Sequence, residues 1–292
     1  MNIGILASGG DGPGMNNCLY EIVKGLKNHK TTLFEYGYQG IVDGITVNYT
    51  LSELNKVKTL GGVIIKSSRS QEFMTQKGMQ KAIRTIKKHE IDCLVIMGGN
   101  GSLCGAKELV KKGVKVLFVP TTIDNDIKES DYSLGFDTAI YQASQFVKDV
   151  DFSMQSFDRI CIYEVMGRHC PDLANRVGKN VNACYVFTAN STKEDLLKNV
   201  KHAIKIGNYS PKIILQENTV NIEELKKYLQ ENLKNRDIKT SIIGYYQRGG
   251  HATELELKYS KLFACEIIKC IKEKQFNKMV VKKKNIFESI DI

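Results

Sequence analysis

Two carboxylates, Asp124 and Asp126, are the first feature of the sequence with the potential for chemistry. They lie in Pro120-Thr-Thr-Ile-Asp-Asn-Asp126, directly after an apolar run at residues 114–119 with the pattern of a buried parallel strand. In an extended chain both side chains point to one side, so one can accept a proton while the other holds a metal ion. Ligands of open α/β sheets bind beyond the carboxyl ends of strands, where this motif falls. A solvated acidic turn is the alternative.

Two glycine-rich segments repeat this placement, because each directly follows a predicted strand. They are Ser8-Gly-Gly-Asp-Gly-Pro-Gly-Met-Asn16 and Gly98-Gly-Asn-Gly-Ser102. Glycine lets the backbone turn tightly and approach a phosphate, whose charge is favoured at the N-terminus of the following helix. We therefore expect Gly9, Gly99 and Thr122 to line one rim of a sheet. A plain strand-to-helix turn is the alternative for each glycine loop.

Strands and helices alternate along the rest of the chain. The first run has predicted strands at residues 3–7, 32–36, 62–65, 92–97 and 115–119, and helices at 13–29, 78–89 and 103–112. The second run has strands at 159–165, 184–188, 212–216 and 240–245, and helices at 136–150, 192–206 and 222–234. A helix at 255–272 and a short strand at 279–281 end the chain. Ser191 and Glu194 have the spacing of a capping box. The alternation predicts two doubly wound α/β units.

Composition narrows the class of protein. The 292 residues are 42% hydrophobic and 25% charged, as in an ordinary globular protein. No apolar run approaches the ~20 residues of a membrane span, and no signal peptide is expected at the start. Eight cysteines without Cys-x-x-Cys spacing indicate reduced thiols and a cytoplasmic location.

The charge of the chain points to small anions. The net charge is +10, but the lysines are scattered, without the basic stripe of a nucleic-acid-binding protein. Only seven of the 42 basic residues are arginines. Because arginine offers a rigid, bidentate anion contact, the loop positions of Arg69, Arg168 and Arg248 indicate phosphate handling.

Six motifs together resemble the bacterial ATP-dependent 6-phosphofructokinase family. In order they are the two glycine-rich segments, Pro120-Thr-Thr-Ile-Asp-Asn-Asp, Gly135-Phe-Asp-Thr-Ala, Glu164-Val-Met-Gly-Arg and Gln247-Arg-Gly-Gly. The resemblance covers essentially the whole chain. It implies two three-layer α/β/α domains of the phosphofructokinase fold, with the active site in the cleft between them. Residues 1–134 with 248–292 would bind nucleotide, and residues 135–247 would bind the sugar phosphate.

The resemblance also implies roles for individual residues. Asp124 is similar to the general base that takes the proton of the sugar 1-hydroxyl, with Thr122 and Arg168 completing the catalytic set. Asn100 and Asp126 match positions that hold Mg²⁺. The nucleotide-binding positions are Gly9, Arg69, Ser70, Gly99, Asn100, Gly101 and Ser102. The substrate-binding positions are Thr122, Ile123, Asp124, Arg159, Met166, Gly167, Arg168, Glu217, Lys239, Tyr245, Tyr246, Gln247 and Arg248. Arg159 and Lys239 would reach the sugar phosphate of a neighbouring subunit.

The sequence departs from the family pattern at several of these positions. Asn100 replaces a magnesium-binding Asp, and an amide oxygen brings no negative charge. Gly101 is the small residue of ATP users, whereas pyrophosphate users usually have Asp there. Lys239 replaces an arginine and loses its bidentate fork. Tyr245 replaces a sugar-contacting histidine.

The expected function is therefore that of a cytoplasmic, homotetrameric phosphofructokinase with active sites shared between subunits. It would transfer the γ-phosphate of ATP, with Mg²⁺, to the 1-hydroxyl of fructose 6-phosphate in glycolysis, without nucleic-acid or membrane partners. A pyrophosphate-dependent enzyme is one alternative. The other is a weakened paralogue that binds sugar phosphate as a regulatory subunit. The downstream motifs disfavour a lipid or nucleotide kinase.

Overall fold

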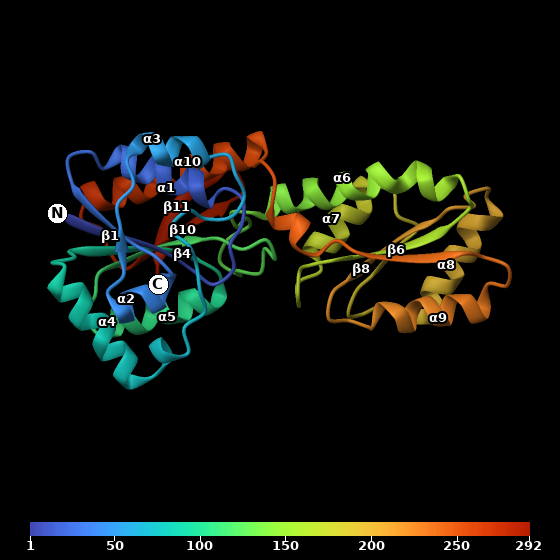
Figure 1. The fold of residues 1–292 in the computed structure, drawn as a ribbon, viewed down its shortest axis with the longest axis horizontal. Helices are drawn as coiled ribbons and strands as arrows, with labels where there is room; N and C mark the ends of the chain where they lie inside the picture. Colours follow the sequence, from blue (N-terminus) through green and yellow to red (C-terminus); the bar gives the residue numbers. More distant parts are fainter. The chain divides into compact units, whose positions relative to one another are not determined.

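Two separate β-sheets organise the chain, one in each unit of the computed structural model, which describes residues 1–292 (Figure 1). Unit 1 comprises Met1–Thr122, Asp126–Asp137 and Arg248–Ile292, and unit 2 comprises Ile123–Asn125 and Thr138–Gln247. The chain changes unit twice within the predicted catalytic motif, after residue 122 and after residue 125.

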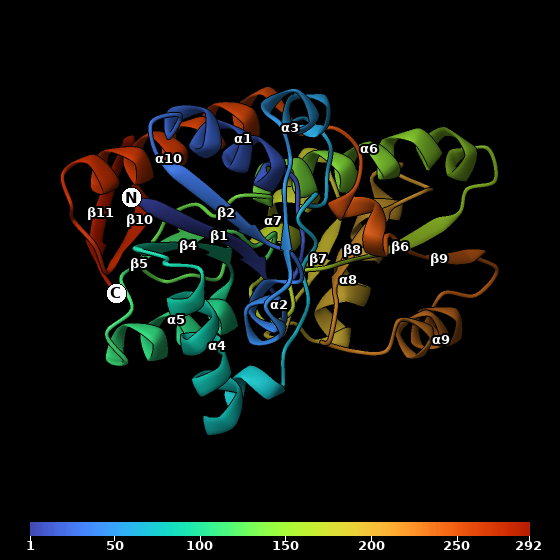
Figure 2. The same cartoon turned by 60° about the vertical axis from the view of Figure 1, so that its left-hand side comes forward.

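The sheet of unit 1 has seven strands in the order β11-β10-β5-β4-β1-β2-β3. The strands are β1 (Asn2–Ser8), β2 (Lys30–Phe34), β3 (Thr46–Val47), β4 (Cys93–Gly98), β5 (Val116–Pro120), β10 (Lys278–Lys283) and β11 (Ile286–Asp291). The helices are α1 (Met15–Gly25), α2 (Gly37–Asp43), α3 (Leu51–Val57), α4 (Gln76–Lys88), α5 (Asn100–Lys111) and α10 (Glu254–Lys272), with a 3-10 turn η1 (Glu72–Met74). Helices α1, α3 and α10 pack together on one face of the sheet, and α2, α4 and α5 cover the other (Figures 1 and 2).

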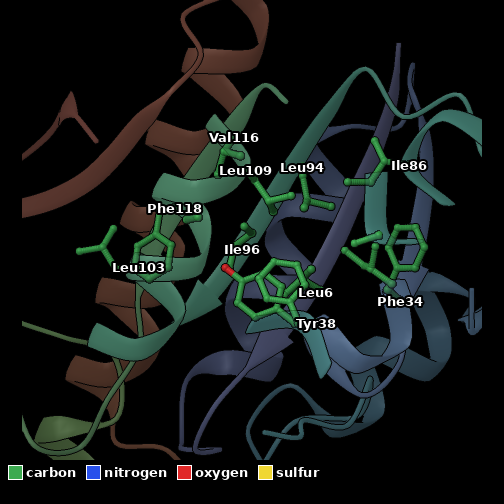
Figure 3. Close-up of a cluster of buried hydrophobic side chains, with 14 of the residues drawn as sticks. Leu6, Phe34, Tyr38, Ile86, Leu94, Ile96, Leu103, Leu109, Val116 and Phe118 are labelled. Atoms are coloured by element: carbon green, nitrogen blue, oxygen red, sulfur yellow. The ribbon is translucent and has the colours of Figure 1, made fainter. Parts of the chain in front are cut away.

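The central strands of unit 1 are buried on both faces. Every residue of β4 and β5 is buried. On one face, Leu6, Phe34, Ile96 and Phe118 pack against apolar side chains of the covering helices (Figure 3). Strands that are buried on both faces have continuous apolar sequences, which is why the sequence predicts β4 and β5 well. The core holds the carboxyl ends of β1, β4 and β5 in register, with Ser8 beside Gly98 and Gly98 beside Pro120.

The sheet of unit 2 has four parallel strands in the order β7-β8-β6-β9. The strands are β6 (Ile160–Val165), β7 (Tyr185–Phe187), β8 (Lys212–Gln216) and β9 (Ile238–Ile242). The helices are α6 (Phe136–Gln155), α7 (Asp172–Asn180), α8 (Lys193–Lys205) and α9 (Ile222–Asn232), and a 3-10 turn η2 (Gly244–Arg248) follows β9. Helices α6 and α7 lie on one face of this sheet and α8 and α9 on the other (Figure 1). The α/β prediction is confirmed.

Several local predictions are wrong. Residues 62–65 form turns rather than a strand. The short helices α2 and α3 and the antiparallel hairpin of β10 with β11 were not predicted. Helix α8 is capped one residue later than expected, because the Thr192 side chain accepts a hydrogen bond from the amide of Asp195, while Ser191 binds the amide of Thr188.

None of the helices has both the length and the apolar run that a membrane crossing requires.

Candidate active site

The predicted rim of unit 1 is present, because the carboxyl ends of β1, β4 and β5 lie side by side. A Cβ built on Gly99 would lie 3.5 Å from the Cβ of Thr122, and one built on Gly9 would lie 3.3 Å from the Ser102 hydroxyl oxygen. Ser102 in turn donates to the carbonyl of Ser8 at 2.9 Å. The structure therefore brings the two glycine loops and the start of the Asp124 motif to one sheet edge.

Two glycines of the second loop face different surroundings. A Cβ on Gly98 would lie 2.5 Å from the side chain of Ser102 and 2.7 Å from the carbonyl oxygen of Ser8, which are closer than real contacts. A Cβ on Gly101 would have no atom within 4 Å. Gly98 is thus required by close packing of the backbone, whereas Gly101 leaves open space at the start of α5.

Asn100 and Asp126, the predicted metal-binding pair, lie together in unit 1. The side-chain amide nitrogen of Asn100 donates to the main-chain oxygen of Asp126 at 3.1 Å. This bond uses the amide nitrogen of Asn100, so its amide oxygen can serve as a metal ligand beside Asp126. No group of three or more His, Cys, Asp or Glu side chains is placed to hold a metal ion. One amide and one carboxylate, completed by phosphate oxygens and water, fit Mg²⁺, which usually takes few protein ligands.

The segment carrying Arg69 and Ser70 is tied to the first glycine loop. The Ser67 hydroxyl donates to the carbonyl of Gly9 at 2.8 Å, and Ser70 donates to Gln39 at 2.6 Å. Arg69 itself is exposed. Its segment lies beside the first glycine loop, and its nucleotide-binding role stays a prediction.

Arg248 lies beside the same glycine loop. Its guanidinium is 3.6 Å from the carboxylate of Asp11, and a Cβ built on Gly10 would lie 3.7 Å from the same guanidinium. The structure therefore places Arg248 among the residues of unit 1, although the sequence grouped it with the substrate-binding set.

Asp124 lies in unit 2, next to Arg168. The side chain of Asp124 is only 12% exposed, and its Oδ2 lies 3.7 Å from Nε of Arg168. Asn125 has a left-handed backbone with φ of 52°, so the chain is not extended here. The expectation that an extended chain points Asp124 and Asp126 to one side is therefore wrong. Ile123, beside Asp124, is buried.

Two side chains bind the first amides of the loop at residues 166–170, which we call the Arg168 loop. Gln247 accepts from the amide of Met166 at 3.2 Å. Glu217 accepts from the amides of Gly167 and Arg168 at 3.1 and 3.0 Å. The loop thus follows β6 with its first three amides bound to side chains of unit 2.

Two residues of this loop have left-handed backbones, with φ of 127° for Gly167 and 47° for Arg168. The conformation suits glycine but is uncommon for arginine. Near the loop, burial and then the charge of Glu217 raise the pKa of the Glu164 carboxyl.

Arg159 and Lys239 lie at the amino-terminal ends of strands β6 and β9, away from the Arg168 loop. Arg159 directly precedes β6, and Lys239 is the second residue of β9, whereas the Arg168 loop follows β6. The six residues of β6 separate the two ends by roughly 16–20 Å, at ~3.3 Å per residue. Both cations pair with Asp237, at 2.7 and 3.0 Å, and their hydrogen bonds lower its pKa. The structure does not bring them to the Arg168 loop of the same chain.

The aromatic pair of η2 is largely exposed. Tyr245 is 78% and Tyr246 47% exposed, and the Tyr246 ring meets Phe146 edge-on at 5.7 Å between centroids. One contact of the Arg168 loop was missed from sequence: Gln216 donates to the carbonyl of Arg168 at 2.7 Å. A glutamine that ends an apolar strand gives no sequence signal for such a contact.

Comparison with known proteins identifies the family of the chain. The Phosphofructokinase family model matches residues 2–271. The chain is 35% identical to a protein of Malacoplasma penetrans named "Probable ATP-dependent 6-phosphofructokinase", over 95% of this chain and 89% of that one. It is also 35% identical to the "ATP-dependent 6-phosphofructokinase" of Clostridioides difficile, over 86% of this chain and 80% of that one.

A solved structure gives the same result for the fold. Pichia pastoris phosphofructokinase in the T-state superposes with a TM-score of 0.93 at 25% identity, over 99% of this chain and 34% of the longer yeast chain. The chain thus spans about a third of that protein. With the match of the family model over nearly its whole length, the chain belongs to the phosphofructokinase family.

Proposed function

We propose that this protein is an ATP-dependent 6-phosphofructokinase that transfers the γ-phosphate of ATP to the 1-hydroxyl of fructose 6-phosphate. The observation that carries the proposal is the pairing of the shielded Asp124 carboxylate with Arg168. The Asp124 motif begins at the sheet edge that also carries both glycine loops. The names of the bacterial relatives support the same donor and acceptor. The reaction belongs to glycolysis.

Asp124 acts as the general base in this proposal. Its carboxylate accepts the proton of the sugar hydroxyl as that oxygen attacks the terminal phosphorus of ATP, whose bond to the β-phosphate oxygen breaks to release ADP. Arg168, 3.7 Å away, neutralises negative charge on the transferring phosphoryl group and orients the carboxylate. Thr122, at the rim formed by the glycine loops, contacts the phosphoryl group. Positioning and charge neutralisation supply most of the rate enhancement in phosphoryl transfer.

The glycine loops and the Arg69 segment bind the nucleotide. Amides at the start of α5 and the open space above Gly101 accommodate its phosphates. The same space favours ATP over pyrophosphate as donor, because pyrophosphate users fill this position with a carboxylate.

Asn100 and Asp126 would hold Mg²⁺ together with phosphate oxygens. When bound, the ion neutralises charge on the transferring phosphates. Because Asn100 supplies no charge, we expect the magnesium affinity to be lower than with a carboxylate at this position.

The remaining substrate residues divide between two sugar-phosphate sites. Glu217, Met166 and Gly167 bind the sugar next to Arg168. Arg159 and Lys239, at the opposite strand ends, bind the phosphate in the site of a neighbouring subunit. This division supports a homotetramer with shared active sites. The eight free cysteines suit the reducing cytoplasm.

The test is a magnesium-dependent assay for fructose 1,6-bisphosphate, with ATP or pyrophosphate as donor. We expect product with ATP only. Folded protein that forms no product from either donor would reject the proposal. Calorimetric binding of fructose 6-phosphate without turnover would instead favour a regulatory subunit.

The Asn100→Asp variant, assayed beside the wild type, tests the metal pair. We expect the magnesium concentration for half-maximal rate to fall by about tenfold, as ~1.4 kcal/mol of added attraction gives. An unchanged magnesium dependence would mean that Asp126 and the phosphates suffice.

A further inference from the structure

Gln216 is a buried polar residue that none of the assigned roles uses. It is the last residue of β8 and is 1% exposed. In the sheet of unit 2 it pairs with Val165, the last residue of β6. Its side chain therefore lies where β6 leads into the Arg168 loop.

The side chain of Gln216 binds the backbone of Arg168. Its amide nitrogen donates to the Arg168 carbonyl oxygen at 2.7 Å. The backbone amide of Arg168 donates to the side-chain carboxylate of Glu217 at 3.0 Å. Gln216, the last residue of β8, and Glu217, which follows it, thus hold both polar groups of the Arg168 backbone.

The Arg168 backbone needs such support. Its φ of 47° is a left-handed conformation that costs free energy in a residue with a side chain. Such a conformation persists where the surroundings impose it. The preceding Gly167 cannot be replaced freely either, because a Cβ there would lie 3.0 Å from the carbonyl oxygen of Cys170.

A second observation separates Gln216 from an ordinary core residue. The Oε1 atom of its amide is buried without a hydrogen-bond partner. Burying an unpaired carbonyl is unfavourable, and an apolar side chain of similar size would avoid that cost. The bond from its nitrogen to Arg168 is thus the gain that a glutamine brings to this position.

We propose that Gln216 is a positioning residue, which holds the left-handed backbone of Arg168 and so fixes the guanidinium beside Asp124. Glu217 contributes from the amide side of Arg168, and Gln247 holds Met166 two residues earlier. The consequence for catalysis rests on the proposed function, because it acts through Arg168.

The proposal is tested with Gln216→Met, which keeps the length and removes the donor. Gln142→Met is the matched control, because Gln142 is also a buried glutamine of unit 2 and makes no hydrogen bond to the Arg168 loop. Amide hydrogen exchange of residues 166–170 is the first measurement and needs no turnover. We expect exchange to quicken about tenfold in Gln216→Met and to stay at the wild-type rate in the control.

Turnover is measured in two backgrounds. With fructose 6-phosphate and ATP at saturation, we expect kcat of Gln216→Met to fall about 10- to 100-fold, as misplaced catalytic groups do. In an Arg168→Ala background the same substitution should change kcat by less than about twofold, because the two changes act through one group. A merely structural role would lower both backgrounds alike.

The outcomes separate the two proposals. If the wild type turns over but Gln216→Met exchanges and reacts like the control, the positioning role is overturned and the function stands. Faster exchange in a wild-type background without turnover would keep the positioning of the loop and reject the function. If Gln216→Met does not fold, Gln216→Asn replaces it, since its shorter amide cannot span the same distance.

Discussion

Two loops at strand ends, one in each unit, are held in place by different means. In unit 1 the segment at Gly98 is fixed by close packing, with Ser102 and the carbonyl of Ser8 filling the space of a side chain. In unit 2 the Arg168 loop is held by side chains, with Glu217, Gln216 and Gln247 bound to its backbone.

The difference follows from what each loop must present. A loop that binds phosphate through its amides needs a bare, closely packed backbone, and glycine provides it. A loop that presents one guanidinium needs a fixed side chain, so its backbone is held by neighbouring polar groups. Substitutions should therefore act through sterics in unit 1 and through hydrogen bonds and charge in unit 2.

The largest expected effect comes from Asp124→Ser in unit 2. Removal of a general base costs about 10²- to 10⁴-fold in rate, and we expect kcat to fall within that range. Fructose 6-phosphate binding, measured by calorimetry, should change by less than about tenfold, because the carboxylate acts on the hydroxyl that reacts.

Asp149→Ser is the control for Asp124→Ser, since it removes one exposed carboxylate from the same unit. Its kcat should equal that of the wild type within about twofold, as expected for a surface substitution. Equal losses in the two variants would show that overall charge, rather than the Asp124 carboxylate, controls the rate.

Sequence reasoning succeeds best where one local pattern determines the structure. The buried strands β4 and β5 are continuous apolar runs, and the glycines at residues 98–101 mark the turn that follows β4. The placement of Gly9, Gly99 and Thr122 at one rim of unit 1 follows from this alternation, because parallel strands end at the same edge of a sheet.

Contacts between distant segments could not be predicted in this way. Gln216 and Arg168 are 48 residues apart in the chain, and only the pairing of β8 with β6 brings them together. The left-handed Asn125 likewise overturns the strand-based expectation for Asp124 and Asp126, because one residue leaves the extended conformation. The hairpin of β10 and β11 was missed as well, since only a short strand at residues 279–281 was predicted there.

A steric change in unit 1 should have an intermediate effect. Gly98→Ala places a methyl group 2.5 Å from Ser102, and we expect the free energy of unfolding to fall by about 1–3 kcal/mol, as for overpacked cores. Gly101→Ala is the matched control, since its methyl group meets nothing within 4 Å. Because alanine favours helix, the control should be as stable as the wild type or about 0.5–1 kcal/mol more stable.

Urea unfolding of the two alanine variants is the measurement. Equal stability of Gly98→Ala and Gly101→Ala would show that packing around Gly98 relaxes freely. The contrast between a sterically fixed loop and one held by side chains would then be lost.

The smallest expected effect concerns charge near the Arg168 loop. Burial, and then the charge of Glu217, raise the pKa of Glu164 in the folded protein. As pH rises above the ordinary pKa value near 4.5, the unfolded chain loses this proton before the folded protein does, so the wild type loses stability through this window.

The variant Glu164→Gln does not titrate and should gain stability relative to the wild type as pH rises from about 4.5 towards neutrality. Urea unfolding at several pH values measures the difference, with the exposed Glu129→Gln as a control for net charge. A stability difference for Glu164→Gln that is constant across this range would mean that neither burial nor the charge of Glu217 raises the pKa of Glu164 in the folded protein.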